Sequence, residues 1–143
     1  MTAAVPGGWT SLGATDNADW YQIQEDVIAI VPRENARDNQ ASARESIAIQ
    51  KRHWRSAGRR GGVVVFMDNL LDQDSGARAV YMNESDPTCT TCYALVGDTI
   101  FSQAVASVFT GLARPQVPTR MFRTLDEAMP WIEEMNRTRG GPL

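Results

Sequence analysis

The segment Ala94–Thr124 constrains the fold more than any other part of the chain. It opens with a short apolar run that ends at Gly97 and continues into a stretch with apolar residues at helical spacing. One glycine and two prolines then mark a loop before a β-prone run over 119–123. The following residues, 124–127, form a capping box that opens another helix. This order predicts one unit of a layered α/β domain.

The segments before this one extend the same pattern. The runs at 20–24 and 27–31 are β-prone and only two residues apart, which predicts an antiparallel hairpin. Val63–Met67 is apolar without alternation, as is typical of a strand covered on both faces. The other expected elements are helices over about 38–57, from 74–76 and from 98, with strands over 93–96 and 119–123. We therefore expect an α/β fold, a single mixed β-sheet with packed helices in the order β-β-α-β-α-β-α-β-α.

The length of 143 residues fits one domain with one core. Residues 1–15 are rich in small and turn-forming residues without periodicity, so we expect a flexible leader there. The domain is expected over 16–137, and residues 138–143 are expected to form a frayed tail. We interpret Leu70–Gln73 as a loop.

Composition narrows the class of protein. The net charge of −3 disfavours a dedicated nucleic-acid binder, and the 43% hydrophobic and 22% charged residues are ordinary globular values. No apolar stretch approaches the ~20 residues that cross a bilayer. The first nineteen residues lack a basic start and an apolar core, so we expect no secretory signal and a cytoplasmic location.

Basic residues crowd the end of the helix that Gly58 stops. The cluster consists of Lys51, Arg52, Arg55, Arg59 and Arg60. We interpret it as compensation of the helix dipole on a solvated face, with a phosphate- or partner-binding patch as the alternative. His53, the only histidine, lies among these charges, and we expect it to be exposed.

Cys89 and Cys92 form the one motif with direct chemical potential. A Cys-x-x-Cys pair at a helix N-terminus would indicate a redox pair with a lowered thiol pKa. This pair instead precedes a strand, and a zinc site would need four ligands. We interpret the two cysteines as partly buried and non-functional, and they remain weak metal candidates only.

Several motifs carry a resemblance to a known family. They read Gly97, Phe101-Ser102-Gln103, Val108-Phe109-Thr110-Gly111-Leu112 and Pro118-Thr119-Arg120-Met121-Phe122. These residues resemble a branch of small bacterial STAS-like (anti-sigma-factor-antagonist-like) proteins with no assigned activity. STAS domains are related in fold to the lipid-exchange CRAL-TRIO domains, and the resemblance extends more weakly over about residues 20–135. It implies a regulatory or protein-interaction domain.

In phosphorylatable STAS domains, a turn of the type Asp-Ser-Ser/Ala-Gly carries the phosphorylated serine. This chain has Gln73-Asp74-Ser75-Gly76 at the matching place. Alignment on Gly76 puts Asp74 at the acceptor position, whereas alignment on Asp-Ser makes Ser75 the acceptor. Whether Ser75 is phosphorylated stays open.

Four acidic residues follow or approach the carboxyl ends of the central strands, where open α/β sheets bind ligands. They are Asp68, Asp72, Asp74 and Asp98. A cation or a ligand amine is one interpretation, and helix capping at Asp74 and Asp98 is the other.

Four aromatic residues could line a lipid pocket or belong to an ordinary core, and we favour the core. They are Tyr93, Phe101, Phe109 and Trp131.

We therefore expect a non-catalytic domain without a cofactor that acts through protein contacts. The expected partner surface combines the loop around 72–78 with the helix start at 98–103. It consists of Asp72, Asp74, Ser75, Gly76, Arg78, Asp98, Ser102 and Gln103. The alternatives are a small-ligand or lipid-binding module and a thiol protein built on Cys89 and Cys92. We also expect a homodimer in which the N-terminal region contributes.

Overall fold

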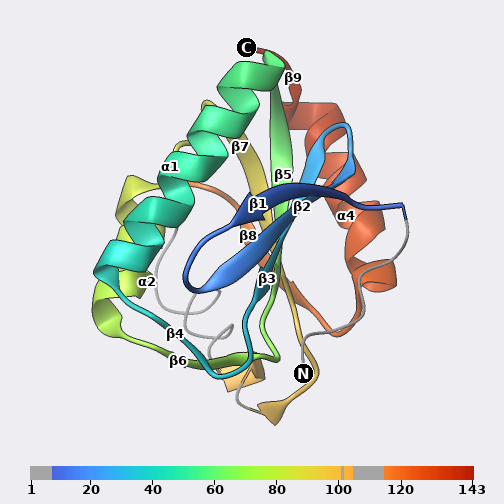
Figure 1. Ribbon diagram of the computed structural model, residues 1–143. Coiled ribbons are helices and arrows are strands. Elements are labelled where there is room, and N and C mark those ends of the chain that lie inside the picture. Colours follow the sequence, from blue (N-terminus) through green and yellow to red (C-terminus); the bar gives the residue numbers. More distant parts are fainter. Residues whose placement is uncertain (1–7, 101, 105–114) are drawn as a thin grey trace.

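The structure is a computed structural model that describes residues 8–100, 102–104 and 115–143 (Figure 1). Its centre is a mixed sheet in the order β1-β2-β3-β5-β7-β8, in which β9 adds to β5. The strands are β1 (Thr10–Ala14), β2 (Ala18–Gln24), β3 (Val27–Pro32), β5 (Arg59–Phe66), β7 (Thr90–Val96), β8 (Thr119–Phe122) and β9 (Gly141–Pro142). β1, β2 and β3 pair antiparallel, whereas β3, β5, β7 and β8 pair parallel. The expected α/β class with a mixed sheet is confirmed.

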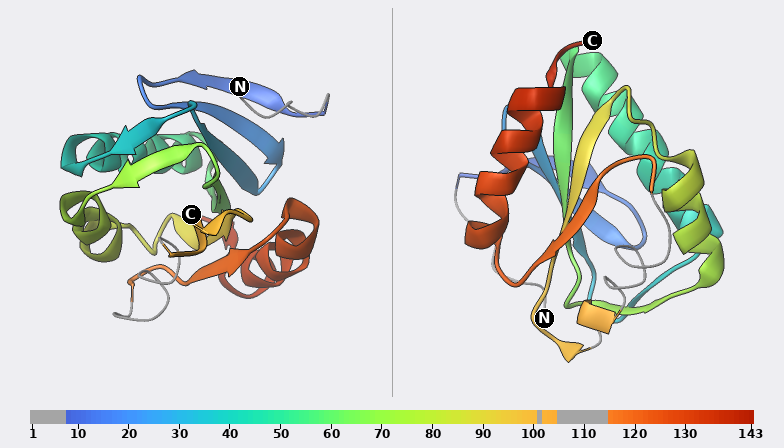
Figure 2. Two further views of the ribbon diagram at one scale, coloured as in Figure 1. Left: turned by 90° about the horizontal axis from the view of Figure 1, so that it is seen from below. Right: turned by 180° about the vertical axis from the view of Figure 1, so that it is seen from behind.

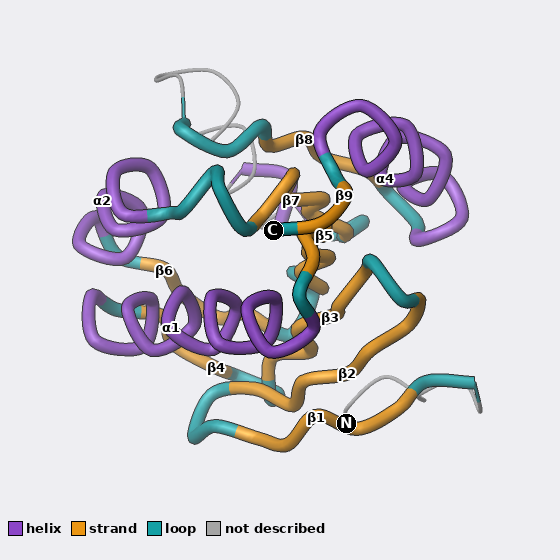
Figure 3. Tube along the Cα trace, turned by 90° about the horizontal axis from the view of Figure 1, so that it is seen from above, coloured by secondary structure: helices purple, strands orange, loops and turns teal. Residues whose placement is uncertain are grey.

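The helices cover the two faces of this sheet unequally. α1 (Gln40–Ala57) and α2 (Ser75–Glu84) lie on one face, and α4 (Leu125–Arg139) lies on the other (Figures 2 and 3). α1 connects β3 to β5, and α2 connects β5 to β7, always in the same direction along the sheet. Right-handed crossovers that move one way place their helices on one face. α4 follows the last parallel strand and is free to cover the opposite face.

Local signals explain why α1 begins and ends where it does. Asn39 and Ser42 form a capping box at its start, and Gly58 ends it in the left-handed conformation at φ 70°. Trp54 anchors the helix to the sheet. A Cβ atom at Gly61 would lie only 2.2 Å from the Trp54 ring, so only glycine lets this side chain reach β5.

The core has two layers because alternate side chains of the central strands point to opposite faces. Val63 belongs to the cluster beneath α1 and α2, whereas Val64 belongs to the cluster beneath α4. Both are fully buried. The prediction that this strand is central and covered on both faces is therefore confirmed.

The structure corrects the sequence interpretation at three segments. Residues 10–14, expected in a flexible leader, form strand β1 on β2, and Trp9 packs against Tyr21 and Phe66 at ring distances of 5.8 and 5.7 Å. Leu70–Gln73, interpreted as a loop, is strand β6, which pairs with β4 (Ala36–Asp38) in a small parallel sheet. The expected frayed tail contains β9, which pairs with the start of β5. The β4–β6 and β5–β9 pairings join segments that are distant in the chain, whereas β1 pairs with β2 in a local hairpin whose first strand is fully exposed and shows no apolar alternation.

Candidate functional site

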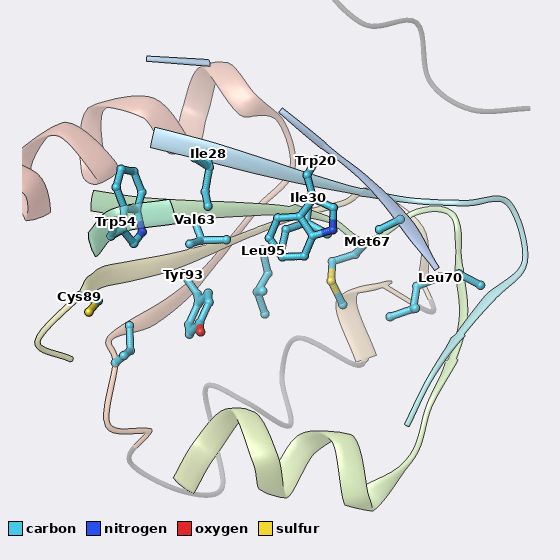
Figure 4. Close-up of a cluster of buried hydrophobic side chains, with 13 residues drawn as sticks. Trp20, Ile28, Ile30, Trp54, Val63, Met67, Leu70, Cys89, Tyr93 and Leu95 are labelled. Atoms are coloured by element: carbon cyan, nitrogen blue, oxygen red, sulfur yellow. The ribbon is translucent and has the colours of Figure 1, made fainter. Parts of the chain in front are cut away.

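A cavity of about 80 Å³ lies between the sheet and the α1–α2 layer. Most of its wall is apolar, and Figure 4 shows Trp20, Ile30, Met67 and Leu95 gathered on this face of the sheet. Tyr93 points from β7 toward α2 beside them. Ligand pockets typically combine such a wall with a few placed polar groups.

The small β4–β6 sheet supplies the polar end of the cavity. Its register places Asp38 beside Gln73. The Gln73 amide nitrogen donates to Asp38 Oδ2 at 3.1 Å, and the Ser42 hydroxyl donates to Asp38 Oδ1 at 2.5 Å. Because both oxygens of Asp38 accept hydrogen bonds, the group has the bonding pattern of a carboxylate.

Two buried polar atoms in the cavity wall have no hydrogen-bond partner among the residues that the structure describes. They are the indole nitrogen Nε1 of Trp20 and the amide oxygen Oε1 of Gln73. Trp20 is 2% exposed and Gln73 is 7% exposed, so bulk water does not serve them. A buried polar group left without a partner costs about 1–3 kcal/mol, which makes this pair the most informative feature of the site.

A hydrogen-bond network closes the other side of the cavity. The Tyr93 hydroxyl donates to Gln50 Oε1 at 2.7 Å, and Thr90 Oγ1 donates to the same oxygen at 3.2 Å. The Gln50 amide nitrogen donates to Ser46 Oγ at 3.3 Å. Burial raises the pKa of Tyr93 to about 12, and burial, with the nearby Asp38 charge, raises the pKa of Tyr81 well above its usual range. Both phenols therefore stay protonated at neutral pH.

The first half of the expected partner surface lies at the start of α2. Asp74 caps this helix, because its Oδ1 accepts from the Ala77 backbone nitrogen at 2.8 Å. Ser75 and Gly76 form the first turn, and Arg78 donates to the Gln73 carbonyl. Asp72 is exposed on β6. The capping interpretation of Asp74 is thus confirmed.

The second half lies where β5 and β7 end. Asp68 Oδ1 accepts from the backbone nitrogens of Asp98 and Thr99 at 3.0 and 3.3 Å. Ser102 is buried, and its backbone nitrogen donates to Thr99 Oγ1, so Thr99 caps this turn in place of Asp98, which was expected to be the cap. A Cβ at Gly97 would lie 2.6 Å from Ser102 Oγ, so this junction requires glycine.

The side chains of this second half face away from the cavity wall. Asp98 Oδ1 lies 3.9 Å from Arg123 Nε in an exposed ion pair. Gln103 lines a separate shallow depression that includes Phe122 and Glu127. The expected surface is therefore two groups with different contacts, and their polar atoms mostly stabilise the fold.

Cys89 and Cys92 lie on opposite faces of the sheet. Cys89 is 1% exposed in the core beneath α1 and α2, and Cys92 is fully buried in the core beneath α4. Burial raises the pKa of Cys92 to about 11. The described part of the chain holds no cluster of three or more potential metal-ligating side chains. This arrangement opposes both a disulfide between these cysteines and a metal site on them.

The basic cluster contacts acidic and carbonyl groups. Arg59 pairs with Glu25 at 2.9 Å, and Arg55 pairs with Asp86 at 3.8 Å. Arg60 donates to the carbonyls of Thr88 and Pro142. His53, expected to be exposed, is half-buried because its ring packs edge-on against Trp54.

The expected aromatic group does not form one pocket. Tyr93 faces α2, whereas Trp131 packs in the cluster beneath α4, on the other face of the sheet. Phe101 and Phe109 lie outside the described residues. Sequence reasoning found Tyr93 but missed Trp20, Asp38, Ser42 and Gln73, because only the β4–β6 pairing brings the last three together.

These observations define an α/β domain with a partly polar cavity between its layers. Residues 21–136 match the family model described as "Domain of unknown function (DUF7793)", and the chain belongs to this family. No curated protein and no solved structure matches the chain. No helix in the described ranges is long and apolar enough to cross a membrane.

Proposed function

We propose that this domain is a non-catalytic binding module that holds a small molecule in the cavity between the sheet and the α1–α2 layer. One observation carries the proposal: Trp20 and Gln73 both line this cavity, and each carries a buried polar atom without a hydrogen-bond partner in the described part of the chain. A bound molecule that pairs with both atoms removes a cost of about 1–3 kcal/mol for each.

The chemistry of the wall supports binding rather than catalysis. The pKa values of Tyr81 and Tyr93 are raised, so neither phenol serves as a base near neutral pH. Both oxygens of Asp38 already accept hydrogen bonds from Ser42 and Gln73. Neither a histidine nor a cysteine lines the cavity within the described ranges.

A second candidate function is contact with a protein partner, as the STAS resemblance implies. A specific observation favours it: Leu71 is 45% exposed and Ile100 is 91% exposed, and they flank the two halves of the expected partner surface. Both side chains would add apolar contact area if a partner protein bound at these loops. We propose this surface as the place where a regulatory STAS-like domain would meet its partner.

A cavity-filling variant tests the first proposal. Ala36 is 7% exposed and lines the cavity, so Ala36→Leu places extra methyl groups inside it. Ala48→Leu makes the same change on an exposed position of α1 and serves as the matched control. Binding of phenol and cyclohexanol is followed by ligand-observed NMR, with thermal unfolding to confirm that both variants fold.

We expect the wild type and Ala48→Leu to bind at least one of these compounds, and we expect Ala36→Leu to lose at least tenfold in affinity. A folded Ala36→Leu that binds like the wild type would contradict the proposed site.

Capture of proteins from native cells tests the second candidate. The wild type and the control variant Leu12→Ser should capture the same protein, whereas the variant Leu71→Ser/Ile100→Ser should not capture it.

A further inference from the structure

The polar atoms of the cavity specify the hydrogen-bonding groups that a ligand must carry. The indole nitrogen of Trp20 is a donor only, so it needs an acceptor. The unpartnered atom of Gln73 is an acceptor, so it needs a donor. Its nitrogen Nε2 already donates to Asp38 Oδ2 at 3.1 Å, and exchanging the two amide atoms would turn the amide oxygen toward a carboxylate. The amide orientation is therefore fixed, and Oε1 needs a donor.

The charge of the wall decides the charge of the ligand. Asp38 lines the cavity, and among the described residues neither a lysine nor an arginine does. An anion entering here would lose its hydration and meet the Asp38 carboxylate without a compensating cation. A cation would lose its hydration against a largely apolar wall, and the oxygens of Asp38 are already engaged by Ser42 and Gln73. An uncharged molecule meets neither cost.

The size of the cavity limits the ligand further. One water molecule needs roughly 10–15 Å³ of such volume. The cavity, at about 80 Å³, therefore holds about six water-sized groups. A cavity of about 150 Å³ holds a benzene ring, so a single small ring is the upper limit for the ligand here, whereas an acyl chain or a nucleotide requires several times more room.

We propose that the cavity binds a small uncharged molecule with an apolar body that offers an acceptor to Trp20 Nε1 and a donor to Gln73 Oε1. This inference rests on the proposed function and adds the chemical class of the ligand. An alcohol, a phenol or a primary amide belongs to this class, because each carries both a donor and an acceptor.

Four probes of similar size separate the possibilities: phenol, toluene, benzoate and benzylammonium. Phenol carries both hydrogen-bonding functions, toluene replaces the hydroxyl with a methyl group, and the other two carry opposite charges. Dissociation constants are measured by NMR titration of the uniformly ¹⁵N-labelled protein. The indole N–H signal of Trp20 is assigned from its NOE contacts in the wild type, and its absence in Trp20→Phe confirms the assignment.

We expect phenol to bind about tenfold more tightly than toluene and to shift the Trp20 indole signal downfield. Trp20→Phe removes the donor and keeps an aromatic ring, so phenol should lose about tenfold in affinity while toluene changes little. Trp131→Phe is the control, because Trp131 packs on the opposite face of the sheet. If Trp20→Phe does not fold, the downfield shift in the wild type decides the result.

The other possible outcomes of the titration contradict the polar selection, the neutrality of the ligand or the proposed function. Toluene binding as tightly as phenol, with no shift of the indole signal, would refute the polar selection and leave the proposed function standing. Benzoate or benzylammonium binding more tightly than phenol would refute the inferred neutrality. Failure of all four probes to bind would refute the proposed function together with this inference.

Discussion

Gln73 and Asp74 are neighbours in the chain, but their side chains have different roles. Asp74 accepts the Ala77 backbone nitrogen at the start of α2, so its polar atom is satisfied inside the fold. The Gln73 side chain instead donates from its nitrogen to Asp38, and its buried oxygen has no hydrogen-bond partner among the described residues. At the scale of residues, a polar atom with an internal partner stabilises the fold, and a buried atom without one calls for an explanation such as a water, an ion or a ligand.

Asp74→Ala tests the structural role of the cap. Loss of an N-cap costs about 0.5–2 kcal/mol, so we expect the free energy of unfolding to fall by that amount with the fold retained. Chemical denaturation measures the change. Asp72→Ala, on the exposed part of β6, should change stability by less than about 0.5 kcal/mol. Equal effects of the two variants would show that Asp74 is not the cap.

The imidazole of His53 makes stability depend on pH. Burial lowers its pKa, so the folded protein holds the neutral ring more strongly than the unfolded chain does. As the pH falls through the unfolded value of about 6.5, the unfolded chain takes up the proton first, and stability decreases. Between pH 8 and pH 5.5 the wild type should therefore lose more stability than His53→Gln. Parallel losses in urea denaturation would argue against this role.

At the scale of elements, the sequence predicted those strands and helices whose formation is encoded by neighbouring residues. The hairpin, α1, α2 and α4 all lie where capping residues, turn lengths and apolar spacing placed them. β1, β4, β6 and β9 were missed, because a strand of two to five residues is defined by its partner and carries little periodicity of its own. The cavity was missed for the same reason, since its polar end depends on the β4–β6 pairing.

The two faces of β5 should respond differently to a buried charge. Val64 is fully buried beneath α4, so Val64→Asp places an unpaired carboxylate in an apolar core and should unfold the domain. That change costs several kcal/mol against a total stability of about 5–15 kcal/mol. Val65→Asp, half-buried in the cavity wall, should be milder. Circular dichroism and thermal melts show which variant is more destabilised. A folded Val64→Asp would contradict the described core.

At the scale of the whole molecule, β1 is one of the two edge strands of the sheet, and β8 is the other. All five residues of β1 are exposed, including Leu12 at 37%, so its outer backbone groups are a template for pairing. β1 is short and its register shifts between Ser11 and Gly13, two features that weaken such pairing. The expectation that the N-terminal region contributes to a homodimer therefore becomes a proposal about this strand.

Light scattering at high micromolar concentration tests the dimer. We expect twice the chain mass of 15.8 kDa for the wild type. Leu12→Lys puts a charge on the exposed edge and should return the protein to the monomer mass, whereas Leu143→Lys, at another exposed apolar position, should not. A monomeric wild type at this concentration would rule out pairing through β1.

The strand order has a consequence for synthesis on the ribosome. From β1 to β8 the sheet grows in the order in which the strands leave the exit tunnel, so each new strand finds its neighbour already present. The hairpins come first and close within a few residues, whereas β5 and β7 each wait for a crossover helix. Until β7 emerges, the valines of β5 form an unprotected growing edge. A pause in translation between these two strands is therefore the moment at which the nascent chain is most exposed to aggregation and most in need of a chaperone.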